Sequence, residues 1–140
     1  MNWILPAQTL LDLIASDPTP AHAWASSVDT RALRVSVISF AQTHAAIMRA
    51  ANAGLRSRLD SDFGSLIAQL EADAGVPPLP FIAAHASVWE ALMHEPSLSG
   101  VAQTDRQVYA TAMYEGLTVV EEAHAATPAL RSLGIEILDL

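Results

Sequence analysis

The side chains of this 140-residue chain that could do chemistry are mainly carboxylates near the ends of predicted strands and helices. Asp105 lies in the first turn of a predicted helix, and Glu121 and Glu122 directly follow an apolar segment. Hard divalent cations such as Mg²⁺ and Mn²⁺ bind anionic oxygen ligands, and a bound ion can activate water and neutralise a phosphate. With Asp12, these acids are candidate ligands of a metal site in which Asp105 would be the catalytic residue.

Each of these acids also has an ordinary structural explanation. A carboxylate at a helix start, as at Asp105, is stabilised by the helix dipole without any further role. Glu121 and Glu122 are adjacent, so in extended backbone their side chains point in different directions, and acids are common on protein surfaces. Both explanations stay open at this point.

The other reactive residue types form no recognisable site. The absence of cysteine excludes disulfides, thiolate metal sites and cysteine nucleophiles. Nucleotide-binding glycine motifs, a phosphate-loop lysine and the serine-hydrolase motif are also absent. No two histidines have the spacing of a helical zinc site, and four aromatic residues are expected to anchor the core. The histidines are His22, His44, His85, His94 and His124, and the aromatic residues are Trp24, Trp89, Tyr109 and Tyr114.

The composition predicts one globular domain over residues 1–140. Hydrophobic residues make up 51% of the chain and charged residues 16%, which is typical of a folded domain rather than a disordered segment. No apolar stretch reaches the ~20 residues that a membrane span needs, so no membrane partner is expected. Because cysteines and signal-peptide features are missing, a cytoplasmic location is expected.

The charge balance disfavours a broad phosphate-binding surface. Fifteen acids oppose seven cations, all of them arginine, and the net charge is −8. Nucleic-acid-binding surfaces usually carry clustered basic residues, and only Arg49, Arg56 and Arg58 come close to such a cluster. RNA is therefore a disfavoured partner.

Short apolar strands are expected to alternate with helices along the chain. Strands are predicted at residues 2–5, 34–38, 76–81, 117–120 and 135–138, the third being a proline-rich extended segment. Helices are predicted after residue 6 and at residues 21–28, 40–53 (capped by Ser39), 55–74, 83–94, 105–115 (capped by Thr104) and 128–132. This alternation predicts an α/β fold, with a mostly parallel sheet of about five strands and helices on both faces. Functional residues of such sheets lie beyond the carboxyl ends of the strands.

The order of these segments resembles the PIN domain, in particular the VapC-type endoribonuclease toxins of bacterial toxin-antitoxin pairs. Residues 105–112, DRQVYATA, are similar to the family's Asp-x-x-Ile-Ala-Ala-Thr-Ala helix, and residues 116–120, GLTVV, to its Gly-Leu-Thr-Leu-Val strand. Weaker similarities at residues 4–13, 36–41 and 134–138 extend the resemblance over nearly the whole chain. The resemblance implies about four acids holding Mg²⁺ or Mn²⁺, a homodimer, and an antitoxin-like partner protein.

The acidic positions that the resemblance implies are mostly replaced. Pro6 stands at the first acidic position and Gln42 at the second, while Ala123 stands at the last and only Asp105 is kept. One carboxylate makes a poor magnesium site, because the ion loses its water reluctantly and needs several ligands. The leading hypothesis is therefore a degenerate PIN-domain protein, a pseudoenzyme without a cofactor that acts by binding protein or nucleic acid.

Two other hypotheses stay open. The first is an active Mg²⁺- or Mn²⁺-dependent endoribonuclease whose rearranged site uses Asp105 with Glu121, Glu122 or Asp12. The second is an unrelated small α/β interaction module.

Overall fold

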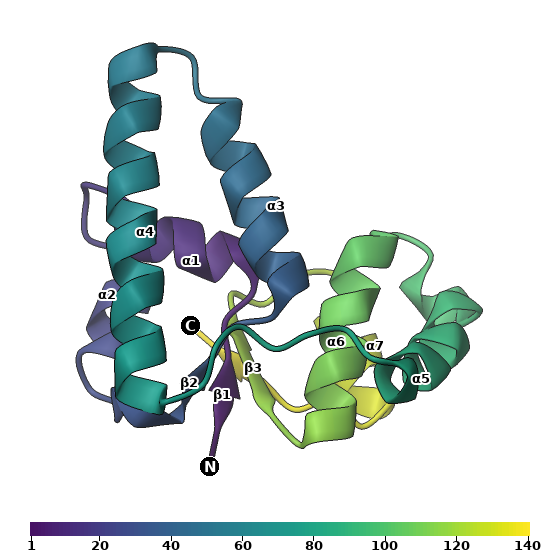
Figure 1. The fold of residues 1–140 in the computed structure, drawn as a ribbon. Helices are drawn as coiled ribbons and strands as arrows, with labels where there is room; N and C mark the ends of the chain where they lie inside the picture. The colour runs from purple at the N-terminus through teal and green to yellow at the C-terminus, as the bar shows by residue number, and fades with distance from the viewer.

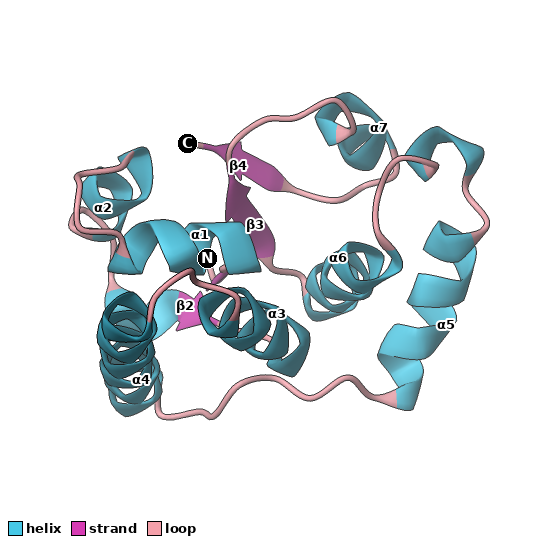
Figure 2. Ribbon diagram, turned by 90° about the horizontal axis from the view of Figure 1, so that it is seen from above, coloured by secondary structure: helices cyan, strands magenta, loops and turns pink.

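A computed structural model describes residues 1–140, and its centre is a four-stranded sheet with helices on both faces (Figures 1 and 2). The strands are β1 (Trp3–Ile4), β2 (Leu33–Arg34), β3 (Thr118–Glu121) and β4 (Ile137–Asp139), in the order β2-β1-β3-β4 with every pairing parallel. The helices are α1 (Ala7–Ile14), α2 (Pro20–Ala25), α3 (Val37–Met48), α4 (Ala53–Ala74), α5 (Ala83–Met93), α6 (Gln103–Glu115) and α7 (Thr127–Ser132), with 3-10 turns at Thr30–Ala32 and Pro96–Leu98. The predicted α/β class and parallel sheet are confirmed.

The prediction of a fifth strand is wrong. Within residues 76–81, only Leu79 pairs, forming an isolated parallel bridge with Ser36. Leu79 donates its N–H to the carbonyl of Val35 at 2.7 Å and accepts from the N–H of Val37 at 2.9 Å. The prolines on both sides of Leu79 have no N–H to donate, so the pairing cannot extend into a strand.

The second strand is shorter than predicted, because the following helix begins earlier. β2 ends at Arg34 and α3 begins at Val37, with Ser36 instead of Ser39 as its N-cap. The Oγ of Ser36 accepts the backbone N–H of Ser39 at 3.0 Å. A buried serine cap thus outweighs the strand preference of the β-branched residues at 35, 37 and 38.

The short strands bury both of their faces, because neighbouring residues point to opposite sides of the sheet. Ile4 and Val119 belong to an apolar cluster with α5, α6 and α7, whereas Leu5 and Val120 belong to one with α1, α3 and α4. All four side chains are fully buried. Two covered faces explain why the strands are uniformly apolar.

The helices α3 and α4 form a hairpin whose far end projects beyond the sheet (Figure 1). Consecutive helices were predicted over residues 40–53 and 55–74, and α4 ends after residue 74, as predicted, with Gly75 as its C-cap in the left-handed conformation at φ 72°. No helix is both long and apolar enough to cross a membrane.

Two glycines are expected to respond oppositely to alanine. Gly116 ends α6 with φ 67°, and a Cβ there would meet no atom within 4 Å, so Gly116→Ala adds only backbone strain. The expected cost is roughly 1 kcal/mol. Gly64 lies inside α4 and is equally open, so Gly64→Ala is expected to stabilise by roughly 1 kcal/mol. Urea denaturation measures the free energy of unfolding of both variants, and changes of the same sign at the two positions would contradict the prediction.

Candidate functional site

A cavity of about 470 Å³ lies where the chain leaves β1 and β3. Its polar lining comes from distant parts of the sequence, because the parallel strands end at the same edge of the sheet. Pro6 follows β1, Gln42 lies on α3, Asp105 on α6, and Glu121 ends β3. The structure therefore gathers the positions predicted from the strand ends.

The Asp105 carboxylate is bound to an amide in this cavity. The Nε2 of Gln42 donates to Asp105 Oδ1 at 3.0 Å and to the Oγ1 of Thr104 at 3.0 Å. Thr104 was predicted to cap α6, but the helix begins at Gln103 and its N-cap is Ala102, without a side-chain cap bond. The hydroxyl of Thr104 instead helps to join α6 to α3.

Glu121 is the buried acid of the cavity, with 9% of its surface exposed. The Tyr109 hydroxyl donates to Oε1 of Glu121 at 2.8 Å and lies 3.1 Å from Oε2. The Nε2 of His124 lies 3.2 Å from Glu121 Oε1 and 3.2 Å from the Tyr109 hydroxyl. Because Nδ1 of His124 accepts the N–H of Ala126 at 3.3 Å, Nε2 is the ring nitrogen that carries a proton and donates it in a hydrogen bond to the carboxylate.

Burial shifts the titration of this cluster. The loss of solvation raises the pKa of Glu121, while the Tyr109 hydrogen bond and the His124 charge lower it, and the nearby Asp105 charge raises it slightly. Burial also raises the pKa of Tyr109, and the charge of Glu121 adds to that shift. The tyrosine hydroxyl therefore remains a protonated donor.

Three of the predicted site residues lie outside this cavity. Asp12 accepts from Nε2 of Gln8 at 3.0 Å on α1, Glu122 is exposed, and the backbone N–H of Ala123 donates to Asp139 Oδ1 at 2.9 Å. No group of three or more histidine or acidic residues is arranged to hold a metal ion. Of the predicted set of Asp105, Glu121, Glu122 and Asp12, only Asp105 and Glu121 therefore line the cavity.

The fold matches several solved structures over nearly its whole length. The structure of FitAcB from Neisseria gonorrhoeae matches with a TM-score of 0.79 and 20% sequence identity, and the match covers 97% of this chain and 96% of that chain. One from Rickettsia felis, of VapBC2 bound to a fragment of promoter DNA, has a TM-score of 0.77 and 13% identity, covering 100% and 99%. VapBC-5 from Mycobacterium tuberculosis, of the VapBC family of toxin-antitoxin systems, has a TM-score of 0.67 and 18% identity, covering 99% and 98%.

The fold is that of a PIN domain. The resemblance inferred from the sequence is thereby confirmed for the architecture. Comparison with family models gives no match, and neither does comparison with curated protein sequences.

Two residues that line the cavity were not predicted as site residues. Tyr109 was expected to anchor the core, and His124 was counted among the histidines that form no recognisable site. Tyr109 does pack in the core, but its hydroxyl reaches Glu121. The spacing gave one usable signal: Tyr109 follows Asp105 by four residues, so both lie on one face of α6.

The raised pKa of Glu121 predicts a pH-dependent stability. The carboxyl group of Glu121 binds its proton more tightly in the folded chain than in the unfolded chain, where its pKa is 4.5. The free energy of unfolding therefore falls as the pH rises from 4.5 through the raised pKa of the folded state. Glu121→Gln is expected to raise the melting temperature at pH 7, and the gain should vanish near pH 4. Tyr109→Phe should raise the pKa of Glu121 further. Thermal melts between pH 4 and 8 would contradict this if the gain were independent of pH.

Proposed function

We propose that this chain is a degenerate PIN-domain protein, related to the toxins of toxin-antitoxin pairs, that acts by binding and lacks metal-dependent nuclease activity. The observation that carries the proposal is the hydrogen bond from Gln42 to Asp105. At this point of the cavity the carboxylate is bound by an uncharged amide donor instead of facing a second acid. An acid at position 42 would instead leave two like charges that require a cation.

The donor atoms of the cavity do not fit Mg²⁺ or Mn²⁺. Pro6 has no side-chain ligand atom, and the Gln42 amide nitrogen, which faces Asp105, is a hydrogen-bond donor rather than a metal ligand. Asp105 and Glu121 are the acids that remain, and Glu121 is already bound by Tyr109 and His124. Octahedral ions of this kind need several oxygen ligands and full charge compensation.

A protein partner similar to an antitoxin is the second part of the proposal. The similar solved structures are of FitAB and VapBC, and two of them contain DNA. A net charge of −8 makes direct RNA binding unfavourable for this chain. Recognition through a partner protein therefore fits the charge better than recognition of RNA.

The test is metal titration combined with RNA cleavage. Calorimetry with Mn²⁺ and Mg²⁺ is expected to show no tight site in the native chain, and single-stranded RNA should stay intact with either ion. The matched variant is Asp105→Asn, which keeps the shape of the side chain and removes its charge. Metal-dependent cleavage that disappears in Asp105→Asn would overturn the proposal in favour of an active endoribonuclease.

A further inference from the structure

The side-chain donors that line the cavity are already directed at oxygen atoms of the protein. Two of them, the Tyr109 hydroxyl and Nε2 of His124, donate to Glu121. The others are the Gln8 amide, which donates to Asp12, the Gln42 amide, which donates to Thr104 and Asp105, and the Ser97 hydroxyl, which donates to Glu95. A ligand in the cavity therefore meets side-chain donors that are already engaged.

The side-chain acceptors of the cavity, by contrast, remain open. The contact between Gln42 and Asp105 joins Nε2 to Oδ1, and neither Oδ2 of the aspartate nor Oε1 of the amide accepts a hydrogen bond within the chain. Glu121 receives its shortest hydrogen bond at Oε1, whereas Oε2 lies 3.1 Å from the Tyr109 hydroxyl. Open acceptors favour a ligand that carries several N–H donors.

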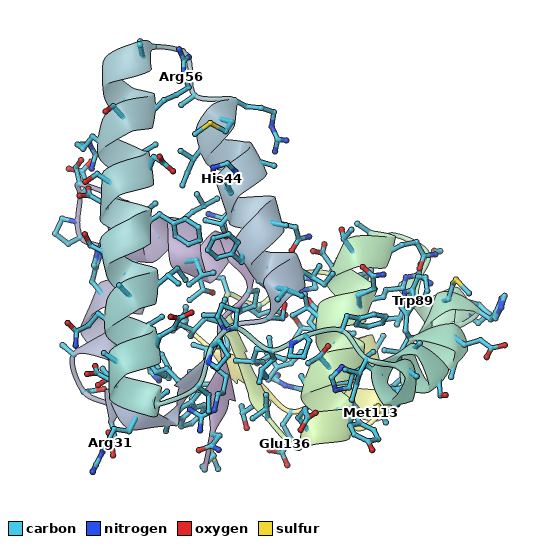
Figure 3. All side chains as sticks on the ribbon, viewed as in Figure 1. Arg31, His44, Arg56, Trp89, Met113 and Glu136 are labelled. Atoms are coloured by element: carbon cyan, nitrogen blue, oxygen red, sulfur yellow. The ribbon has the colours of Figure 1, made fainter.

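No cationic side chain balances the two carboxylates. The chain has no lysine, and none of its seven arginines lines the cavity. Figure 3 shows Arg56 at the far end of the α3–α4 hairpin and Arg31 near the other end of α4, both away from α6. Arg106 is on α6, but its guanidinium donates to backbone carbonyls. The electric field inside the cavity therefore favours a positively charged ligand.

The two carboxylates lie at different depths, with apolar walls between the polar groups. Glu121 is buried, whereas Asp105 is exposed. The apolar part of the lining comes from the ring of Pro6 and from aliphatic side chains that include Val101 and Val108. A ligand that reaches both acids therefore needs an alkyl segment between two charged ends.

The size of the cavity suits an organic cation better than a metal ion. Its volume of about 470 Å³ lies in the range of roughly 300–1,000 Å³ that is usual for small-molecule sites. Mg²⁺ needs an octahedral set of oxygen ligands at about 2.1 Å. An ammonium group needs only three acceptors at about 2.7–3.2 Å, which carboxylate and amide oxygens can supply.

We propose that the cavity binds a linear aliphatic polyamine, with one ammonium group at Asp105 and Gln42 Oε1 and a second at Glu121. The alkyl segment between them would pack on the apolar walls. This inference rests on the proposed function, because a resident metal ion would occupy the same carboxylates. An anion at the first turn of α1, where Pro6 provides no side-chain cap, is disfavoured by the charge of both acids.

Calorimetry with 1,4-diaminobutane and spermidine tests the class of ligand. The native chain, free of metal, is expected to bind one polyamine per chain. Binding of 1-aminobutane should be at least roughly tenfold weaker, because one ammonium group can reach only one carboxylate. The uncharged 1,4-butanediol has the same length and should not bind. The proposal is overturned if neither polyamine gives saturable binding, or if the diol or acetate binds as tightly.

Variants that keep side-chain size test the two carboxylates. Asp105→Asn and Glu121→Gln should each weaken polyamine binding at least roughly tenfold, because each removes one charged acceptor. The matched control is Glu122→Gln, which changes the net charge equally at an exposed acid outside the cavity and should leave the affinity unchanged. Equal losses in all three variants would mean a general attraction to the acidic surface and would overturn the site.

A steric variant tests the place of binding without any change of charge. Ala125 lines the cavity and is exposed, so Ala125→Phe should reduce the space for a ligand and leave the fold intact. The affinity for 1,4-diaminobutane is expected to fall at least roughly tenfold, with an unchanged thermal melt in the absence of ligand. An unchanged affinity would place the amine outside the cavity and contradict the proposal.

Competition with Mn²⁺ separates this inference from the proposed function. Mn²⁺ is expected to weaken polyamine binding no more than NaCl does at equal ionic strength. A native chain that binds neither polyamine nor Mn²⁺ would overturn the polyamine site and leave the proposed function standing. Displacement of the polyamine by low concentrations of Mn²⁺ would overturn the proposed function, while supporting the contact of the amine with these carboxylates.

Discussion

Pro6→Asp/Gln42→Glu is expected to turn the cavity into a Mn²⁺ site. Both positions line the cavity with Asp105 and Glu121, so the double variant would contain four carboxylates where the native chain has two. Gln42→Glu also removes the amide that now donates a hydrogen bond to Asp105. Like charges at this distance favour a bound cation, and oxygen ligands suit Mn²⁺ and Mg²⁺.

The gain in affinity should be strongly non-additive. Either substitution alone leaves three carboxylates, and coordination needs several ligands at once. We expect the double variant to bind Mn²⁺ at least roughly a hundredfold more tightly than either single variant. Calorimetry measures the affinities, and Asp105→Ala in the double variant should abolish the gain.

A matched variant adds the same number of acids in a different place. In Pro6→Asp/Ala123→Asp, the second acid lies outside the cavity, beside the Asp139 carboxylate that accepts from the Ala123 N–H. This variant should bind Mn²⁺ no better than Pro6→Asp alone. Equal binding by the two double variants would show that the cavity is not the metal site.

Stability has to be measured separately from affinity in these variants. Pro6 is the N-cap of α1 and has no side chain that can accept a helix N–H. Aspartate is a favoured N-cap, so Pro6→Asp gains a capping bond while losing the rigidity of proline. Thermal melts without metal give this contribution, and only the additional shift with Mn²⁺ reports binding.

Much of the fold could be predicted because its signals are local. The apolar spacing of α4, the glycine that ends it and the short apolar strands each depend on neighbours in the sequence. Where two local signals compete, the sequence could not decide. Val37 and Ile38 favour a strand, but the buried cap at Ser36 starts a helix.

In the candidate site, too, only the residues placed by local sequence signals could be predicted. Pro6, Gln42 and Asp105 follow from the positions of strand ends and helix starts, and they meet in one cavity. Glu121 was predicted together with Glu122, and the end of β3 separates them: Glu121 is the last residue of the strand and is buried, whereas Glu122 lies beyond the strand and is exposed. The contact of His124 with Glu121 depends on a loop conformation that no sequence pattern encodes.

Arg106 shows what composition and periodicity cannot predict at all. It was not among the predicted site or core residues, yet only 5% of its surface is exposed. Its guanidinium donates to the backbone carbonyls of Val101, Leu92 and Met93 at 2.9 to 3.0 Å. It also donates to a fourth backbone carbonyl, that of Leu98. A buried charge thus holds the loop between α5 and α6, which forms one wall of the cavity.

Arg106→Met is expected to cost about 3 to 5 kcal/mol, because methionine fills a similar volume and leaves four carbonyls without this donor. Arg106→Lys should recover only part of the loss, since one ammonium group cannot reproduce the planar set of donors. The matched control is Arg131→Met, which removes one hydrogen bond to the carbonyl of Ile137 and should cost about 1 kcal/mol. Urea denaturation followed by circular dichroism measures all three. Equal costs for Arg106→Met and Arg131→Met would mean that water satisfies the loop carbonyls and that Arg106 does not hold the cavity wall.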